Sequence, residues 1–455
     1  MSKYKAYPEY KDSGVEWLGE IPTHWICTQI KYGYDITLGK MLQKNKSSSK
    51  DELKPYLKAQ NIQPTGIDLS VVDNMWFSPD EKNKLLLKNN DVLISEGGDV
   101  GRSAIWQGQL AECYIQNAIN RARANNGNSP YFLNYWMVYL KSADFINTLC
   151  NKATIAHYTA EKVESSPILL PNSVEQLHIS LFLDHETAKI DNLIEKQQQL
   201  IELLKEKRQA VISHAVTKGL NPDAPMKDSG VEWLGKIPSH WEMKRLAYLG
   251  SARNGLTYSP ENITDQESGV LVLRSSNIQN SSLCFDDNIY VNSIIPEQFL
   301  VKENDLLICS RNGSRNLIGK NALISKDAEG MAFGAFMAIF RSQINTYIFW
   351  VLNSPLFDYQ SGSFLTSTIN QLTIGNLNSM EIPVPTLKEQ KEIARYLSKK
   401  NDDFIALINK VKNSISLLQE RRTALISAAV TGKIDVRDWV APDTQDIEEL
   451  QEATA

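Results

Sequence analysis

One stretch of fifteen residues occurs twice in this chain, and no other sequence feature constrains the fold as strongly. Lys11 to Trp25 reads KDSGVEWLGEIPTHW, and Lys227 to Trp241 reads KDSGVEWLGKIPSHW. The copies lie 216 residues apart (227 − 11) and differ at only two positions. A match of this length, at an offset of nearly half the chain, indicates an internal duplication.

The repeat continues beyond this stretch as short framework pieces. Residues 56–63 (YLKAQNIQ) are echoed by residues 272–279 (VLRSSNIQ), and residues 91–94 (DVLI) are echoed by residues 305–308 (DLLI). Between these pieces the two halves differ almost completely. Short β-rich runs separated by clusters of Gly, Asn and Ser predict mixed α and β structure. Each half is therefore predicted to carry a divergent globular part on a shared framework.

A long helix is predicted after each globular part. Each begins beyond a proline, Pro171 or Pro385, with a small polar residue and then a glutamate in the first turn, as suits the positive end of a helix. No proline or glycine follows until Gly219 and Gly432. With a rise of about 1.5 Å per residue, each helix reaches about 65–70 Å.

Both helices carry an apolar stripe with 3-4 spacing. Such a stripe is narrow and must be buried against another helix, and the simplest partner is the other copy. The predicted seam comprises Ile194, Gln197, Ile201, Leu204, Arg208, Val211 and Ala215 in the first copy, and Ile408, Val411, Ile415, Leu418, Arg422, Leu425 and Ala429 in the second. Arg208 and Arg422 interrupt the two stripes at the same place. Either each carries its charge out to solvent over a packed stem, or they belong to a buried pair that sets the register.

These patterns predict an α+β fold: two mixed α/β globular domains separated by two long helices that pack as an antiparallel coiled coil, with pseudo-twofold symmetry. The proline-containing stretch after Gly219 has no apolar pattern and is interpreted as a linker. In chain order the predicted segments are a first globular domain (1–170), a first helical spacer (171–219), the linker with a second globular domain (220–384), a second helical spacer (385–432) and a C-terminal tail (433–455).

Cysteine usage and charge narrow the class of protein. Five scattered cysteines without a C-x-x-C pair fit a reducing cytoplasm and argue against a disulfide framework or a structural zinc site. No apolar run reaches membrane-spanning length, and the first residues hold no apolar signal region. The net charge of −5 gives no expectation of nucleic-acid binding, although the acidic tail conceals local basic surfaces. We therefore expect a cytoplasmic protein that does not bind membranes.

No catalytic motif is complete. Residues 313–320 resemble a phosphate loop, but the glycine spacing is wrong and Asn321 stands where Ser or Thr is needed. Residues 221–224 (NPDA) depart from the signature with which adenine methyltransferases hold the target amine, and the six histidines show no metal-ligand spacing. A duplicated protein without catalytic groups suits a two-sided target, and duplex DNA has the matching pseudo-symmetry.

The residues quoted above closely resemble the specificity subunit of type I restriction-modification systems. The resemblance rests on G-V-E-W-L-G-x-I-P-x-H-W at Gly14–Trp25 and Gly230–Trp241, on the framework pieces, and on the two similar helix ends, residues 203–217 and 417–431. It covers about the whole chain.

The resemblance implies a non-catalytic subunit of a larger DNA-modifying and DNA-cleaving complex. Each globular part would be a target-recognition domain for one half of a split double-stranded DNA site, and the helices would set the spacing and dock the methyltransferase. Two methyltransferase (modification) subunits would methylate adenine N6 with S-adenosylmethionine, and two restriction (motor-nuclease) subunits would use ATP and Mg²⁺. All of these cofactors would belong to the partners, and the chain itself would hold neither cofactor nor metal.

Candidate DNA-binding residues lie in the loops after the D-[VL]-L-I pieces and in a lysine-rich stretch. Arginine offers a planar fork to guanine edges or phosphates, whereas Glu96 and Asp99 repel phosphate but can accept from cytosine N4. The lysines between Lys40 and Lys58 either contact phosphates or are merely solvated. The predicted contacts are Arg311, Arg315, Asn312, Arg102, Lys44, Lys46, Gln116 and Arg121. For the last two, and for Asn117 and Arg123, polar contacts within the framework are an equally good interpretation.

The duplicated tryptophans, Trp17 with Trp25 and Trp233 with Trp241, either invade DNA or pack each globular part against the other half's helix. We favour packing, because an element kept in both copies should do the same job in both. Residues 154–159 and 367–373, just before the helices, are expected to be structural.

Two other functions remain open at this point. The chain could be a coiled-coil assembly scaffold whose globular domains bind proteins, or an autonomous DNA-binding protein for split sites. Salt-dependent binding to a split DNA site would exclude the scaffold, and a co-purifying methyltransferase would exclude the autonomous protein. A fused nuclease-methyltransferase partner is a further alternative to separate subunits.

Overall fold

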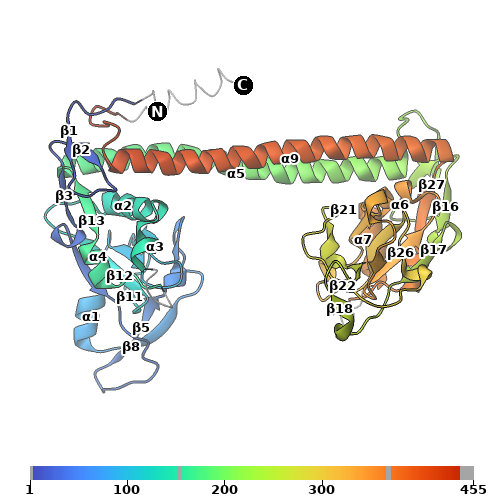
Figure 1. Ribbon diagram of the computed structural model, residues 1–455. Coiled ribbons are helices and arrows are strands. Elements are labelled where there is room, and N and C mark those ends of the chain that lie inside the picture. The colour runs from blue at the N-terminus through green and yellow to red at the C-terminus, as the bar shows by residue number, and fades with distance from the viewer. Residues whose placement is uncertain (1–3, 151–155, 365–369, 441–455) are drawn as a thin grey trace. The chain divides into compact units, whose positions relative to one another are not determined.

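The computed structural model describes residues 4–150, 156–364 and 370–440 (Figure 1). The chain forms two compact units, residues 1–197 with 413–455 (unit 1) and residues 198–412 (unit 2). Each unit therefore contains one globular part together with half of each long helix.

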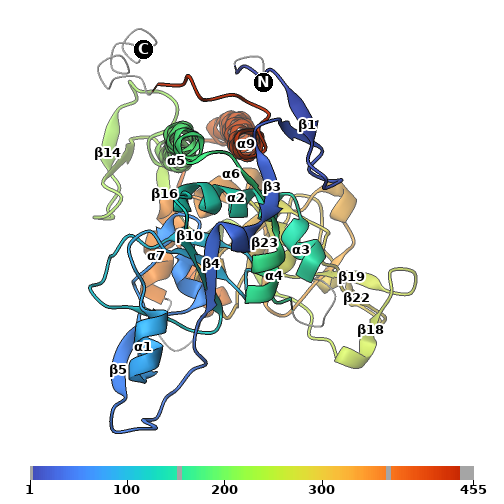
Figure 2. The same cartoon turned by 90° about the vertical axis from the view of Figure 1, so that its left-hand side faces the viewer.

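Unit 1, which faces the viewer in Figure 2, is built on mainly antiparallel sheets. Its main sheet has the strand order β10-β9-β12-β4, and a second sheet has the order β11-β5-β8, in which β11 runs parallel to β5. Two hairpins, β1-β2 and β6-β7, and the pair β13-β3 complete it. The strands are β1 (Tyr10–Asp12), β2 (Glu20–Pro22), β3 (Ile26–Gln29), β4 (Tyr34–Leu38), β5 (Glu52–Leu57), β6 (Ile62–Gln63), β7 (Gly66–Ile67), β8 (Asp73–Phe77), β9 (Val92–Ser95), β10 (Ser103–Ile105), β11 (Tyr114–Ile115), β12 (Ile119–Ala124) and β13 (Pro167–Leu170). The short helices are α1 (Pro79–Leu85), α2 (Pro130–Ser142), α3 (Phe145–Cys150) and α4 (Ala160–Ser165).

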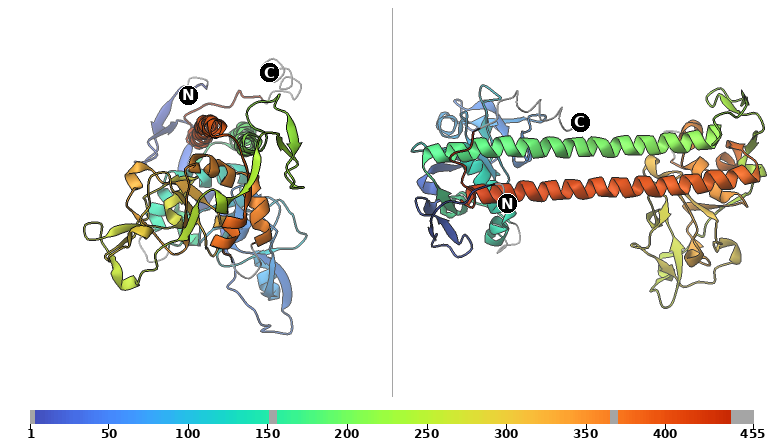
Figure 3. Two further views of the ribbon diagram at one scale, coloured as in Figure 1. Left: turned by 90° about the vertical axis from the view of Figure 1, so that its right-hand side faces the viewer. Right: turned by 90° about the horizontal axis from the view of Figure 1, so that it is seen from above.

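Unit 2, which faces the viewer in Figure 3 (left), repeats this plan. The sheet β17-β26-β23-β24 has the same order as β4-β12-β9-β10, and β16 pairs with β27 as β3 pairs with β13. The strands are β14 (Met226–Asp228), β15 (Lys236–Pro238), β16 (Glu242–Arg245), β17 (Ser251–Asn254), β18 (Ile263–Thr264), β19 (Val270–Leu273), β20 (Ile278–Gln279), β21 (Ser282–Leu283), β22 (Tyr290–Val291), β23 (Leu306–Cys309), β24 (Asn321–Leu323), β25 (Ala332–Phe333), β26 (Met337–Arg341) and β27 (Glu381–Val384). The short helices are α6 (Asn345–Leu352), α7 (Pro355–Phe364) and α8 (Ile374–Ser379). The shared topology confirms the duplication and the mixed α and β composition.

The two long helices are α5 (Ser173–Lys218) and α9 (Leu387–Val430), each within two residues of its predicted bounds. In unit 1 the first half of α5 lies beside the second half of α9, and in unit 2 the remaining halves lie side by side (Figure 3, right). The helices therefore run in opposite directions within each unit, as predicted. No helix in the described ranges is long and apolar enough to cross a lipid bilayer.

Burial along both helices follows the predicted seam. Between Asp191 and Lys207 the only positions that are not exposed are Ile194, Gln197, Ile201 and Leu204, and Ile201 is just 8% exposed. In α9, residues 408, 411, 415, 418, 422, 425 and 429 are likewise half-buried or buried. The 3-4 spacing thus identified the packed stripe correctly in both copies.

The seam arginines form bonds across the helix pair. The Arg208 Nε donates to Asn401 Oδ1 at 2.7 Å within unit 2, and the Arg422 Nε donates to Asp191 Oδ1 at 2.8 Å within unit 1. The Arg422 and Asp191 side chains are 31% and 51% exposed, so they do not form the buried pair, and at this position the solvent-directed interpretation fits better.

The duplicated tryptophans explain how each long helix joins the opposite globular part. Trp25 is fully buried in the unit 1 core, and a Cβ at Gly432, just past the end of α9, would stand 3.4 Å from its ring. In unit 2, a Cβ at Gly219, just past the end of α5, would stand 3.2 Å from the Trp241 ring. Both glycines have a positive φ, which only glycine adopts easily. The packing interpretation is confirmed for Trp25 and Trp241.

Trp17 and Trp233 behave differently from their partners. Trp17 is 41% exposed and stacks on Phe145 of its own globular part, with ring centroids 5.0 Å apart. Trp233 packs on Tyr359 in the same manner, at 4.6 Å. Both rings therefore cover short helices of their own unit, and Trp233 also packs against the core cluster that includes Ile212 and Val216 of α5. For Trp17, contact with the other half's helix stays a prediction.

A carboxylate at the start of each long helix holds the buried tryptophan. Glu175, only 2% exposed, accepts from Trp25 Nε1 at 3.0 Å and from the Tyr7 hydroxyl at 2.7 Å, and its second oxygen lies 2.9 Å from His24 Nε2. Burial, reinforced by this carboxylate, raises the pKa of Tyr7, so the phenol remains a donor. In unit 2, Glu389 accepts from Trp241 Nε1 and contacts His240. The repeated P-x-H-W motif is thus a structural joint: it connects each globular part to the start of one long helix and to the end of the other.

Candidate nucleic-acid interface

The repeated aspartate at the start of each D-[VL]-L-I piece is part of the framework. Asp91 accepts two 2.7 Å bonds from Arg123, and Asp305 is bound in the same way by Arg341, with Nε 2.7 Å from Oδ1. Both carboxylates are almost completely buried, so each pairing clamps the edge of a buried strand, β9 or β23, onto the neighbouring one. These strands lead directly into the two candidate loops.

The repeated asparagine of the S-N-I-Q piece is also structural. Asn61 is 2% exposed, and its Nδ2 donates to the carbonyl oxygens of Asp68 and Val71. Asn277 is fully buried and donates to the carbonyl oxygens of Cys284 and Asp287. The shared sequence pieces therefore preserve a scaffold, and residues that differ between the units are the better candidates for sequence reading.

In unit 1 the loop from Ser95 to Arg102 has its acids compensated by bases. Asp99 forms ion pairs with Lys141 and, at 3.6 Å, with Arg102. Glu96 is 14% exposed and lies 3.6 Å from His157. Arg102 Nη1 also lies 3.4 Å from Gln63 Oε1, so this arginine is partly engaged within the protein. The loop presents a mixed, nearly neutral surface.

In unit 2 the corresponding loop presents arginines. Arg311 is exposed and lies over the Phe336 ring, 5.3 Å from its centroid, and Arg315 is exposed at the start of a 3-10 turn. Asn312 is half-buried, and its side chain bonds to Ser275 and to the amide of Ser314, so it shapes the loop. The structure thus gives Arg311 and Arg315 accessible guanidinium groups on a well-anchored turn.

Each candidate loop is supported by the segment before α4 or α8. The Tyr158 amide donates to Glu96 O at 2.9 Å, and the equivalent Leu372 amide donates to Ser310 O at 2.7 Å. These contacts agree with the structural role predicted for these segments. Of the residues in that prediction, 154–155 and 367–369 lie outside the described part of the chain.

The lysine-rich stretch divides into two groups. Lys40, Lys54 and Lys58 form ion pairs with Glu81, Glu112 and Asp73 respectively. Lys44, Lys46 and Lys50 are exposed, with Lys46 over the Trp76 ring at 5.2 Å from its centroid. Only the second group is available to phosphates, which keeps both Lys44 and Lys46 as candidates.

Arg121 is not an accessible contact. It is 5% exposed, and its guanidinium donates to Thr37 Oγ1 at 2.9 Å and to the Lys84 carbonyl oxygen at 2.8 Å. We therefore correct the prediction that this residue reads bases, because its hydrogen-bonding fork is used inside the protein. Gln116 is half-buried, and its backbone forms an isolated bridge with Lys40. It remains a candidate.

Sequence reasoning missed Met41 and Leu42. Met41 is 75% exposed and Leu42 is 45% exposed, in the same stretch as the exposed lysines. The signal was available, since two adjacent apolar residues stand within a polar, lysine-rich run.

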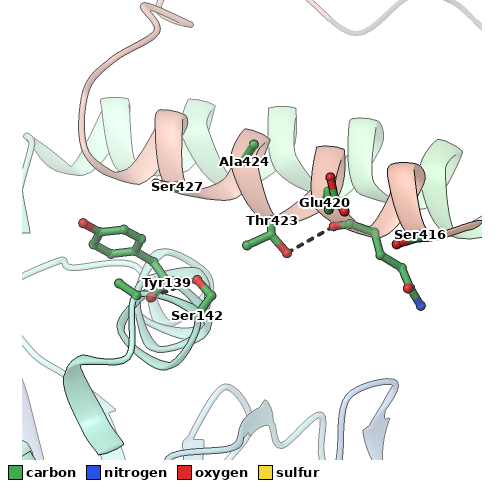
Figure 4. A pocket seen from close by; sticks show the side chains of 9 residues that line it. Tyr139, Ser142, Ser416, Glu420, Thr423, Ala424 and Ser427 are labelled. Atoms are coloured by element: carbon green, nitrogen blue, oxygen red, sulfur yellow. Dashed lines mark hydrogen bonds between the residues drawn. The ribbon is translucent and has the colours of Figure 1, made fainter. Parts of the chain in front are cut away.

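A shallow hollow in unit 1 lacks the character of an active site. It lies between the end of α2 and the adjacent face of α9 (Figure 4) and is lined mainly by small or hydroxyl side chains, including Ser416, Thr423 and Ser427. Glu420 is the one acid in its lining. At the position equivalent to Thr423, unit 2 has Gln209, which donates to Asn353 O at 2.9 Å and so occupies the matching space.

The sequence matches one protein family. The model of the type I restriction modification DNA specificity domain matches residues 35–203 and again residues 238–417. A putative type I restriction enzyme MjaX specificity subunit of Methanocaldococcus jannaschii is 24% identical over 442 residues, covering 92% of this chain and 96% of the relative. The EcoKI specificity subunit of Escherichia coli K12 is 23% identical over 444 residues, covering 93% and 92%.

Solved structures show the same fold. One, from work on complex assembly and conformational transition of the type I R-M system, has a TM-score of 0.70 at 14% identity and covers 90% of this chain and 98% of its own. The HsdS subunit of Thermoanaerobacter tengcongensis has a TM-score of 0.52 at 15% identity and covers 91% and 98%. Both likenesses extend over nearly the whole length of each protein.

Proposed function

Because this chain belongs to the family of type I restriction-modification DNA specificity domains, we propose that each of its two globular parts reads one half of a split duplex DNA site. The chain is the DNA-recognition, non-catalytic component of its class. The observation that carries the proposal is the twofold family match: each match covers one globular part, with the same framework but different loop chemistry. A split site with two different half-sites requires two recognition domains that share a framework but differ in their DNA-contacting loops.

The accessible basic groups account for how the two parts would bind. In unit 2, Arg311 and Arg315 reach guanine edges or phosphates from a loop that β23 and β26 hold in place. In unit 1, Lys44 and Lys46 contact phosphates and position the domain, and the mixed loop with Glu96 and Arg102 faces base edges. Gln116 supports the same surface.

The partners follow from the class of system. Two methyltransferase subunits dock on this chain and methylate adenine N6 with S-adenosylmethionine, and two restriction subunits add ATP- and Mg²⁺-dependent cleavage. All three cofactors bind to the partners. A scaffold that binds only proteins is disfavoured, since the matching family is defined by DNA specificity.

The function is tested by DNA binding of the chain purified with its methyltransferase. Affinity for a genomic fragment that holds the split site should exceed affinity for a scrambled fragment, and it should fall steeply with salt. If at least about six phosphates are contacted, affinity drops about a thousandfold between roughly 50 and 200 mM salt. Equal, weakly salt-dependent affinity for both fragments would contradict the proposal.

Replacing Arg311 and Arg315 together with alanine should relax the reading of one half-site only. Each well-placed arginine contact to a base contributes about 1–3 kcal/mol of discrimination. Mapping of methylated sites should therefore show degenerate bases on the side read by unit 2 and an unchanged motif on the other side. The control is Arg245→Ala, which removes an exposed arginine paired with Glu381 on the β16–β27 strands, away from the candidate loop. An unchanged motif in the double variant would remove both arginines from the reading surface.

A further inference from the structure

The segment between β4 and β5, residues 39–51, is tied down along its backbone. The Lys40 amide donates to Ile115 O at 3.0 Å, and the Trp76 amide donates to Gln43 O at 3.1 Å. The Asp51 carboxylate, 6% exposed, accepts the amides of Ser47 and Ser48 at 3.0 Å each. The segment therefore presents its outward side chains from a fixed backbone (Figure 2, between β4 and β5).

Two of those outward side chains are apolar and adjacent. Met41 is 75% exposed and Leu42 is 45% exposed, and Leu38 at the end of β4 is 39% exposed. A single exposed apolar residue needs no explanation, but a contiguous group on an ordered polar segment indicates a contact surface. The three residues line one hollow together with Gln43 and Lys84.

The charges around this apolar group are positive. Lys44, Lys46 and Lys50 are exposed on the same segment, and Lys84 is exposed on the wall of the hollow. The acids of the segment and the hollow are already engaged: Asp51 by backbone amides, and Glu81 by Lys40. The uncompensated charge suits a polyanion, and of the partners of this family only DNA combines regular phosphates with apolar faces between stacked bases.

The matching segment of unit 2 lacks this combination of exposed apolar and basic side chains. At the same offset of 216 residues, Met41 and Leu42 correspond to Thr257 and Tyr258, and Tyr258 packs against the small core of Val272, Val291 and Ala332. Residues 255–269 contain no lysine or arginine. A role for the segment is therefore confined to the half-site read by unit 1.

We propose that Met41 and Leu42 form a wedge that enters the DNA between neighbouring base pairs at the unit 1 half-site, while Lys44, Lys46 and Lys84 hold the flanking phosphates. This inference rests on the proposed function. Met and Leu are among the side chains that wedge into base steps and kink the duplex. Because the cost of unstacking depends on the step, and is lowest at pyrimidine–purine steps, the wedge adds selectivity at a position where no base edge is hydrogen-bonded.

The test uses the full chain with its methyltransferase subunits and a duplex that carries the mapped target. Single 2-aminopurine substitutions are placed in turn along both half-sites, except at and next to the methylated adenines, which a methyltransferase flips out of the stack, and they report unstacking as a rise in fluorescence. The wild-type complex should give a severalfold rise at one step of the unit 1 half-site. Met41→Ala with Leu42→Ala should abolish that rise and weaken binding on the order of tenfold, comparable to losing one base pair of recognition.

Two further variants keep this result interpretable. Met41→Leu with Leu42→Met preserves apolar volume and should retain the rise. Thr257→Ala in unit 2 is the matched control and should leave the fluorescence at both half-sites unchanged. Because Met41, Leu42 and Thr257 are all exposed, thermal unfolding should be unaltered in every variant.

Each other outcome overturns the wedge in a distinct way. A wild-type complex that methylates its site normally but gives no rise at any step removes the wedge and leaves the proposed function intact. A rise that persists in the alanine variant does the same. Loss of the methyltransferase from the alanine variant, with the rise retained, assigns the pair to a protein contact. A wild-type complex without site preference overturns the proposed function and the wedge together.

Discussion

Trp25→Ala should lower the free energy of unfolding of unit 1 by about 3–5 kcal/mol, the usual cost of removing a large buried aromatic side chain. Trp25 is fully buried between Tyr7, Glu175 and the end of α9, so its removal opens a cavity at the joint between the helices and the globular part. The change also removes one donor from Glu175, which is itself buried, and leaves that carboxylate less well satisfied. Thermal or denaturant unfolding of the purified chain measures the effect.

Trp17→Ala is the matched control for this prediction. Trp17 belongs to the same repeated motif but is 41% exposed and stacks mainly on Phe145. Its loss should cost about 1 kcal/mol, the contribution of an aromatic pair. Equal losses for the two tryptophans would mean that the repeated motif is not the joint that holds the end of α9.

Leu418→Asp should separate the helix pair and abolish site-specific methylation. Leu418 is half-buried in the seam of α9, where an aspartate either loses hydration or forces the helices apart. Removing the apolar contact alone costs about 2 kcal/mol or more, before the charge is counted. Unfolding experiments and methylation by the complex with its methyltransferase provide the two readouts.

Leu417→Asp is the neighbouring control. Leu417 is 64% exposed and points away from the seam, so the same chemical change should alter stability by only about 0.5 kcal/mol. Normal methylation by Leu418→Asp, or equal damage from both variants, would contradict the paired-helix account.

The helices and their packing could be predicted because they depend on local and periodic signals. Proline before each start, glycine after each end and a 3-4 stripe between them are all visible in the sequence, and α5 and α9 follow them closely. The burial of Trp25 and Trp241 followed from a different kind of signal. Two copies of one motif are expected to serve the same role, and for that reason packing was favoured over invasion of DNA.

The roles of the candidate DNA-binding residues were harder to predict, because they depend on contacts between residues distant in sequence. Arg121 and Arg123 stand two residues apart on β12 and looked alike, yet one is enclosed by Thr37 and Lys84 and the other clamps Asp91. Which lysines of the 40–58 stretch stay free depends on acids brought in by other strands and by α1. Neither outcome follows from residue type or spacing, since both require the register of the sheets.

The different roles of the two tryptophans in the repeated motif could not be predicted from the sequence. Trp17 and Trp25 are eight positions apart in one motif, and nothing local indicates that one ring reaches the end of α9 while the other covers α3. The chain turns between them at Gly19, which has a positive φ.

We propose that this chain alone chooses the DNA sites at which its complex acts. The most direct measurement maps N6-methyladenine across the genome of cells that express this chain with its methyltransferase, and of cells that lack only this chain. We expect a split motif, with one half-site on each side of a fixed spacer, that is methylated in the first cells and unmethylated in the second. The same methylated motif in both would contradict it, because site choice would then belong to another protein.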